Sequence, residues 1–126
     1  MIDANAIIRT ALLANAPLVV LTGQRIWAGR NLPPEGYQPS QGGAVAFRVR
    51  GGSTLYHGGL QYPSVQFKCY GLTEVVANNV YRALYDALFT PAGGIRGAVV
   101  DVLGQPAEEE SGWPFVLTFY TIWLKV

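Results

Sequence analysis

The chain has few of the residues from which catalytic and metal sites are usually built. Its 126 residues include one cysteine and one histidine. A lone cysteine cannot form an internal disulfide, and zinc sites need several Cys or His ligands. Cys69 takes an apolar-facing position in a predicted strand, where a free thiol acts as a small hydrophobic side chain. His57 has no recognisable nucleophile or orienting carboxylate nearby in the sequence, so we expect no enzyme, no cofactor and no metal site.

Charged side chains are also scarce. Only 13% of the residues are charged and 50% are hydrophobic, whereas about a quarter of the residues in a typical soluble domain are charged. This bias indicates that part of the surface is covered by other protein, and a compact, weakly charged monomer is the alternative. The formal net charge is +1, which gives no overall signature of nucleic-acid binding.

Long apolar runs are missing as well. No stretch approaches the ~18 apolar residues needed to span a membrane. Asp3, Asn5 and Arg9 interrupt the first apolar residues, and this pattern is unlike a signal peptide. We therefore expect a protein that folds in a reducing cytoplasm without contacting a membrane.

The clearest structural pattern lies in residues 63 to 89. Over residues 63–70 apolar and polar side chains alternate, which is the period of a half-buried strand. Gly71 ends this strand, and Thr73 can cap a helix in which apolar residues recur every three or four positions. A strand followed by a long amphipathic helix predicts a sheet with a helical layer on one face. We expect Phe67, Leu84 and Phe119, each on the apolar face of its element, to be buried in the core of one subunit.

The remaining segments add strands and a second helix. We expect a helix over residues 3–16 with Asp3 as its N-cap, and a brief strand at 25–27. Further strands are expected at 44–50 and at 95–103, with a bulge or weak point at Gly97, and a polar turn over 104–112 leads to a last strand at 113–124. The last strand is apolar on both faces, which places it centrally, and one face of its sheet is left for a partner. The predicted fold is a single α+β domain over residues 1–126, with an antiparallel or mixed sheet of about four strands packed with two α-helices.

Two segments rich in glycine and proline are predicted as loops, at residues 28–43 and 51–62. Loops of this length are usually functional or ordered by a partner, and for 28–43 a flexible surface loop is the alternative. The second segment could form an extended hairpin tip whose apolar side chains suit contact with a partner. The candidate contact residues there are Leu55, Tyr56, His57 and Leu60.

Two groups of charged residues complete the candidate interface. Arg48 and Arg50 share one face of a predicted strand, while Glu108, Glu109 and Glu110 occupy a predicted polar turn. Salt bridges and a solvated turn explain them more simply than phosphate contacts or a metal site. The N-terminal part is mildly basic and the C-terminal part mildly acidic, so the acidic turn of one copy could meet the basic strand of the next.

The order of these segments resembles that of a known family. The matching stretches are residues 21–27 (LTGQRIW), residues 63–70 (PSVQFKCY), the helix over residues 78–88 and the aromatic closing strand over residues 115–123. Together they resemble the tail terminator or tail completion proteins of long-tailed bacteriophages, within the minor tail protein group that includes lambda's terminator.

This resemblance implies a structural protein of the virion. Proteins of that family form a hexameric ring at the head-proximal end of the tail tube, where the ring stops tube growth and joins the tail to the head. The implied partners are further copies of the chain, the tail tube protein and the head–tail connector or stopper. The genome would pass through the ring without sequence-specific binding. The chain would assemble in the host cytoplasm, and in isolation it could be a monomer or a weak ring.

Two alternatives remain open from the sequence. A head-completion or connector adaptor of the phage neck would also form a ring but would be more helical. A small bacterial enzyme or ligand-binding domain would need a deep pocket lined with polar groups.

Overall fold

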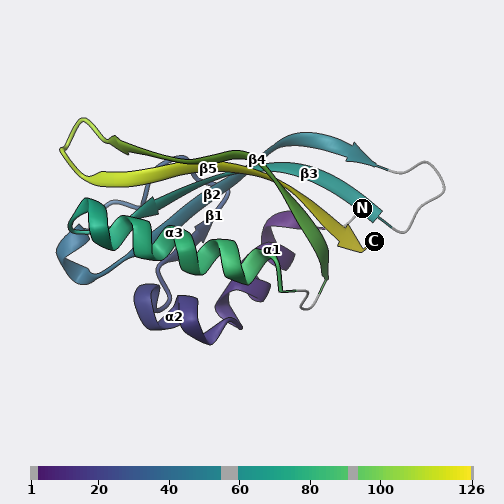
Figure 1. Cartoon of the computed structure of the whole chain (residues 1–126), viewed down its shortest axis with the longest axis horizontal. Coiled ribbons are helices and arrows are strands. Elements are labelled where there is room, and N and C mark those ends of the chain that lie inside the picture. The colour runs from purple at the N-terminus through teal and green to yellow at the C-terminus, as the bar shows by residue number, and fades with distance from the viewer. Residues whose placement is uncertain (1–2, 55–59, 91–93, 126) are drawn as a thin grey trace.

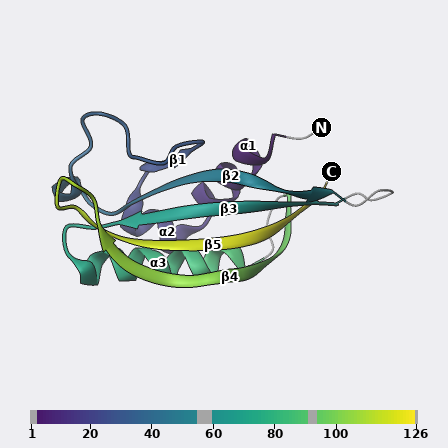
Figure 2. The same cartoon turned by 90° about the horizontal axis from the view of Figure 1, so that it is seen from above.

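Five strands form one mixed sheet in the computed structural model, which describes residues 3–54, 60–90 and 94–125. The strands are β1 (Ile26–Ala28), β2 (Ala44–Thr54), β3 (Leu60–Tyr70), β4 (Ile95–Glu108) and β5 (Pro114–Lys125). Their order in the sheet is β1-β2-β3-β5-β4, as Figure 2 shows from above. Only β1 and β2 run parallel, and the other neighbours are antiparallel. The predicted α+β class is confirmed; the sheet has five strands rather than about four, because the brief strand expected at 25–27 joins it as β1.

Three helices cover one face of this sheet (Figure 1). They are α1 (Ala4–Leu13), α2 (Ala16–Thr22) and α3 (Glu74–Leu88). The predicted helix over residues 3–16 ends early, because Pro17 lacks an N–H and fits only the first turn of a new helix. Asn15 begins that helix by accepting a hydrogen bond from the Leu18 amide at 3.1 Å.

The predicted helix caps are confirmed. Asp3 accepts a hydrogen bond from the Ala6 amide at 3.1 Å. Thr73 accepts one from the Val76 amide at 3.3 Å. Each side chain satisfies an N–H that the first helical turn leaves without a backbone acceptor.

The main core fills the space between the helices and the sheet. Alternation in β3 turns Val65, Phe67 and Cys69 towards α3, as the sequence predicts. The Phe67 ring lies between Phe47 and Tyr120, with ring centroids 5.4 and 5.6 Å away. Burial raises the pKa of the Cys69 thiol, so this side chain behaves as an unreactive part of the core.

One core expectation is wrong. We expected Phe119 to be buried with Phe67, but it lies on the opposite face of the sheet and is only partly buried. Neighbouring positions of a strand face opposite sides, and in β5 the buried positions beside it are Thr118 and Tyr120.

Two segments predicted as loop or turn are largely strand. β2 continues to Thr54 and β3 begins at Leu60, so much of segment 51–62 forms a β-hairpin, with a register shift between Val49 and Gly52. β4 continues to Glu108, well into the predicted turn at 104–112. The bulge expected at Gly97 is confirmed by a register shift after Ile95.

The α-helices in the described ranges have 10, 7 and 15 residues. No single helix there is long and apolar enough to cross a bilayer, and α1 and α2 reach that length and hydropathy only as a pair bent by 91°.

Candidate interaction surface

The loop at residues 28–43 folds over the outer face of the sheet, which is the face opposite the helices. Tyr37 is its anchor and is 3% exposed. The Tyr37 ring makes edge-to-face contacts with Trp27, Trp113 and Tyr70 at centroid distances of 5.2, 5.6 and 6.3 Å. Its hydroxyl donates a hydrogen bond to the Gly42 carbonyl at 2.8 Å. Burial raises the pKa of Tyr37 to about 12, an effect that nearby Arg25 partly offsets.

This packing explains how a long, irregular loop is ordered within one chain. The small aromatic cluster under Tyr37 also covers part of the outer sheet face. This is the face that we expected, from the sequence, to be covered by a partner. A flexible surface loop is therefore not what the structure shows for this segment. A contact between the loop and neighbouring proteins remains a prediction.

A buried ion pair ties the β4–β5 turn to the same face. Lys68 is 8% exposed, and its Nζ lies 2.8 Å from Glu109 Oε1. The Tyr70 hydroxyl donates a second hydrogen bond to that oxygen, also at 2.8 Å. Burial, together with this bond to Glu109, raises the pKa of Tyr70. Glu109 therefore stabilises the position of the β4–β5 turn within its own subunit, while Glu108 and Glu110 remain exposed.

Glu109→Gln is expected to lower the free energy of unfolding by about 1.5–3 kcal/mol. The substitution leaves the buried Lys68 ammonium without its anionic partner, and hydrogen bonds to charged groups contribute in this range. Denaturant unfolding at neutral pH measures the change. Glu108→Gln is the matched control, because Glu108 is exposed and its substitution should change the stability by less than about 0.5 kcal/mol. Equal effects of the two variants would contradict the assigned role of Glu109.

The predicted arginine pair lies on the outer face as expected. Arg48 and Arg50 are both exposed, and the Arg50 guanidinium lies 5.3 Å from the centre of the Phe119 ring. Within the described ranges no carboxylate forms an ion pair with either arginine. They are therefore available to a partner, although the stacking of Arg50 on Phe119 restrains one of them.

The other candidate contact residues belong to the chain segment that joins β2 to β3. Leu55, Tyr56 and His57 fall outside the described residues. Leu60 begins β3, and its backbone pairs with Lys125 in β5. Figure 2 shows this hairpin at one end of the sheet and the β4–β5 turn with the acidic residues at the other. Within one subunit the structure therefore does not bring the hairpin and the acidic turn together.

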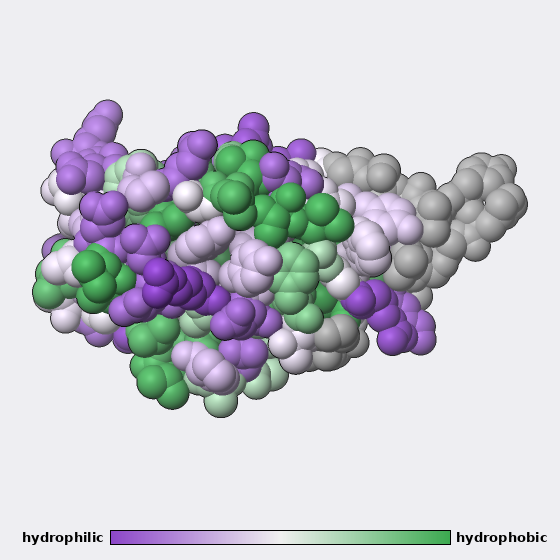
Figure 3. Space-filling model, viewed as in Figure 1, coloured by the Kyte–Doolittle hydropathy of each residue, from purple (hydrophilic) through white to green (hydrophobic). Residues whose placement is uncertain are grey.

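An exposed edge strand is the feature that sequence reasoning missed. β4 forms one border of the sheet, and Val99, Val102 and Leu103 on it are 45%, 38% and 68% exposed. Figure 3 shows apolar residues gathered along β4 on the face that it displays. The segment was correctly predicted as a strand, but no pattern within it shows that it forms a border of the sheet.

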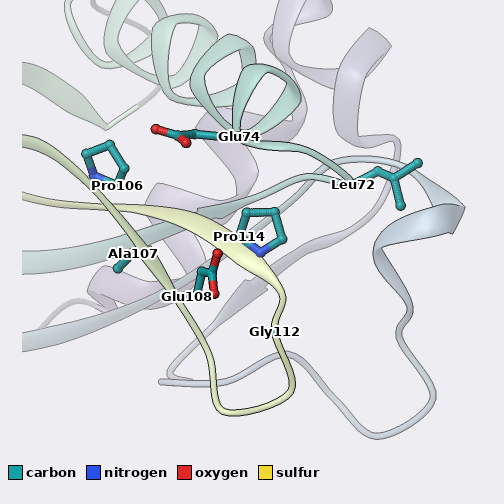
Figure 4. A pocket seen from close by; sticks show the side chains of 7 residues that line it. All are labelled: Leu72, Glu74, Pro106, Ala107, Glu108, Gly112 and Pro114. Carbon is teal, nitrogen blue, oxygen red and sulfur yellow. The ribbon is translucent and has the colours of Figure 1, made fainter.

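Two hollows flank the β4–β5 turn. One of about 460 Å³ lies between this turn and the start of α3 (Figure 4); it is lined by Leu72, Glu74, Pro106, Ala107, Glu108, Gly112 and Pro114. The other, of about 710 Å³, lies between the turn and loop 28–43, with Lys68 and Glu109 in its wall. Both are open to solvent, and within the described residues neither holds a nucleophile hydrogen-bonded to a base. They are surface hollows beside a structural turn.

Comparisons with known proteins give a likeness in fold. No protein-family model and no curated protein sequence matches the chain. Among solved structures, the fold is similar to that of a chain in the "Virion of native gene transfer agent (GTA) particle". The TM-score is 0.67 at 15% sequence identity, and the match covers 98% of this chain and 95% of that chain. The likeness therefore extends over nearly the whole of both chains.

Proposed function

We propose that this chain is a structural protein of a tailed phage or phage-like virion, and that its copies form a ring capping the head-proximal end of the tail tube. The observation that carries the proposal is the similarity in fold, over 98% of the chain, to a component of a gene transfer agent virion. The order of sequence segments resembles tail terminators and supports the more specific role. In that role the ring ends tube growth and joins the tail to the head connector.

The borders and ends of the sheet provide the contact surfaces that a ring subunit needs. A ring subunit needs two lateral surfaces for its neighbours and two ends for the tube and the connector. The sheet has two lateral borders, at β1 and β2 on one side and at β4 on the other. Its two ends carry the β2–β3 hairpin and the acidic β4–β5 turn (Figure 2). We assign these ends to the tail tube protein and to the head–tail connector or stopper.

The genome would pass through such a ring without sequence-specific contacts to its bases. A net charge of +1 neutralises few phosphates, so binding to free duplex at physiological salt should be weak. The α-helices pack against the sheet, and none extends as a recognition helix would. The lumen therefore serves as a passage.

The alternative of a connector adaptor predicts a more helical chain. In the described residues the strands, led by β4 with 14 residues and β5 with 12, hold more residues than the three helices. This balance favours the tail terminator over the adaptor. The open hollows beside the β4–β5 turn likewise lend little support to a ligand-binding domain, which needs a deeper pocket.

Inactivation of the gene in the element that encodes it tests the proposal. Electron microscopy should show filled heads without tails, together with free tails of irregular length. The intact gene supplied in trans should restore joined particles. So should a Val20→Ala copy, because Val20 on α2 is exposed and belongs to none of the contact surfaces proposed here. Normal particles from the inactivated element would overturn the function.

A further inference from the structure

We infer that β4 of one copy pairs with the free edge of β2 in the next copy, so that the sheet continues from subunit to subunit. The inference rests on the proposed function, because it names the contact by which the copies would form a ring. The partner it requires is a second copy of this chain, joined head to tail. Five observations support it: the two open edges, their compatible strand directions, their matching level in the sheet, their opposite charges and the exposed apolar residues of β4.

Both borders of the sheet expose backbone groups that can pair. In the described part of the chain, β4 has a strand partner only on its β5 side. On the other border, β1 covers β2 only at Val45–Phe47, and the Arg30 amide donates to the Phe47 carbonyl at 3.0 Å. From Arg48 to Thr54 no described strand pairs with the outer edge of β2. Unpaired edges of this length are templates for pairing with another chain.

The strand directions are compatible with this contact. β2 is antiparallel to β3, and β3 is antiparallel to β5, so β2 and β5 run the same way. β4 is antiparallel to β5. A neighbouring β2 placed beside β4 without inverting the subunit would therefore form an antiparallel pair, like most pairs within the sheet. Repetition of one such head-to-tail contact gives a ring where the rotation between copies closes.

The two free edges also lie at the same level of the sheet. Arg48 on β2 pairs across to Gln66 on β3, and Gln66 pairs to Phe119 on β5. Phe119 in turn pairs to Val102 on β4. The free part of β2 and the segment of β4 from Ile95 to Val102 thus face outwards at matching heights on opposite borders. Two copies can pair these segments with little shift along the strands.

Opposite charges coincide at that level. Asp101 lies at the register shift between Val100 and Val102, and Val100 is level with Val49 through Tyr120 and Val65. Asp101 accepts a hydrogen bond from the Thr121 hydroxyl at 2.7 Å. Thr121 is two positions from Phe119 and therefore lies on the outer face, as Arg48 and Arg50 do. In the joined sheet the Asp101 carboxylate would meet the arginines of the next copy.

The exposed apolar residues of β4 complete the fit. Val99, Val102 and Leu103 expose apolar side chains to water in a lone subunit, which is unfavourable. On the nearby helix α3 the Tyr85 and Phe89 rings are also exposed, and their centroids lie 4.6 Å apart. Burying such a strip against a neighbour removes its apolar area from water. The bulges of β4 twist its edge, which discourages pairing with unrelated strands.

Cysteine cross-linking tests this contact in the full-length protein. The test variant carries Arg48→Cys together with Val102→Cys. Within one subunit these positions are three strand spacings apart, about 14 Å, which is too far for an internal disulfide. Mild oxidation of the concentrated protein should give a ladder of covalent dimers, trimers and larger species. Native mass spectrometry of the same samples reports the unlinked oligomers.

Two further variants make the result specific. Arg48→Cys with Leu72→Cys keeps one reactive position and moves the other to an exposed site off the edge, so the ladder should be lost. Asp101→Arg should reduce the oligomers, and the exchange of both charges in Asp101→Arg with Arg50→Asp should restore them. A variant that only damages folding would not be rescued in this way.

The outcomes separate this inference from the proposed function. Oligomers that form but do not cross-link through the two introduced cysteines would overturn the edge contact and leave the virion role standing. A chain that stays monomeric and uncross-linked up to its solubility limit would also overturn it. Normal particles from the element with the inactivated gene would instead overturn the function.

Discussion

Phe67→Ala is expected to lower the free energy of unfolding by about 3–5 kcal/mol, the usual cost of truncating a fully buried phenylalanine. Phe67 is wholly buried and packs between Phe47 and Tyr120, with an edge-to-face contact to Tyr120. The substitution would leave a cavity in the main core, between the sheet and the helices. Thermal unfolding measures the effect, and for a chain of this size the loss corresponds to a fall in Tm of roughly 10–20 °C.

Phe119→Ala is the matched control for this experiment. It removes the same atoms from the adjacent strand, but on the partly exposed outer face. Its cost should be less than half that of Phe67→Ala, because less apolar area is returned to water. A fall in Tm of only a degree or two for Phe67→Ala, or an equal fall for both variants, would contradict the assignment of the two faces.

Replacing residues 55–60 by Asn-Gly is expected to abolish the joining of tails to heads while the domain still folds. Thr54 pairs with Gln61, so the replacement leaves these two residues directly flanking a two-residue loop of the kind that closes β-hairpins. The strands and the core therefore stay in register. The variant loses Leu55, Tyr56 and Leu60, the side chains that we propose to contact the tube or the connector.

Circular dichroism and thermal unfolding would establish that this variant folds, and complementation of the inactivated gene would report its function. The control is Val20→Ala on α2, which should complement fully. If the shortened protein completed infectious particles normally, the hairpin would be ordinary surface and its assignment as a contact would be wrong.

The central strand and helix could be predicted from sequence because their signals are local. Alternation in β3, the Thr73 cap and the apolar spacing of α3 each lie within a few residues of one another, and all three agree with the structure. The length of β4 was missed because Gly104 and Pro106 are typical of turns. Proline is tolerated in a strand at the border of a sheet, where its missing N–H need not face a partner.

The contacts that form the candidate surface join residues far apart in the sequence, so no local sequence pattern predicts them. Glu109 meets Lys68 across 41 positions of the chain, so a run of three acids looked like a solvated turn. Tyr37 packs on Trp113 only because the loop at 28–43 folds back over the sheet. The open edges of β2 and β4 likewise follow from the strand order, which depends on the whole chain.

The proposed place of this chain, at the junction of head and tail in the virion, can be tested by locating it in the particle. Purified particles should be labelled with an antibody raised against the recombinant chain and viewed by electron microscopy. We expect label at one site on each particle, where the tail meets the head. Label along the tail, at its far tip or over the capsid would contradict the proposal, as would purified particles that lack the chain altogether.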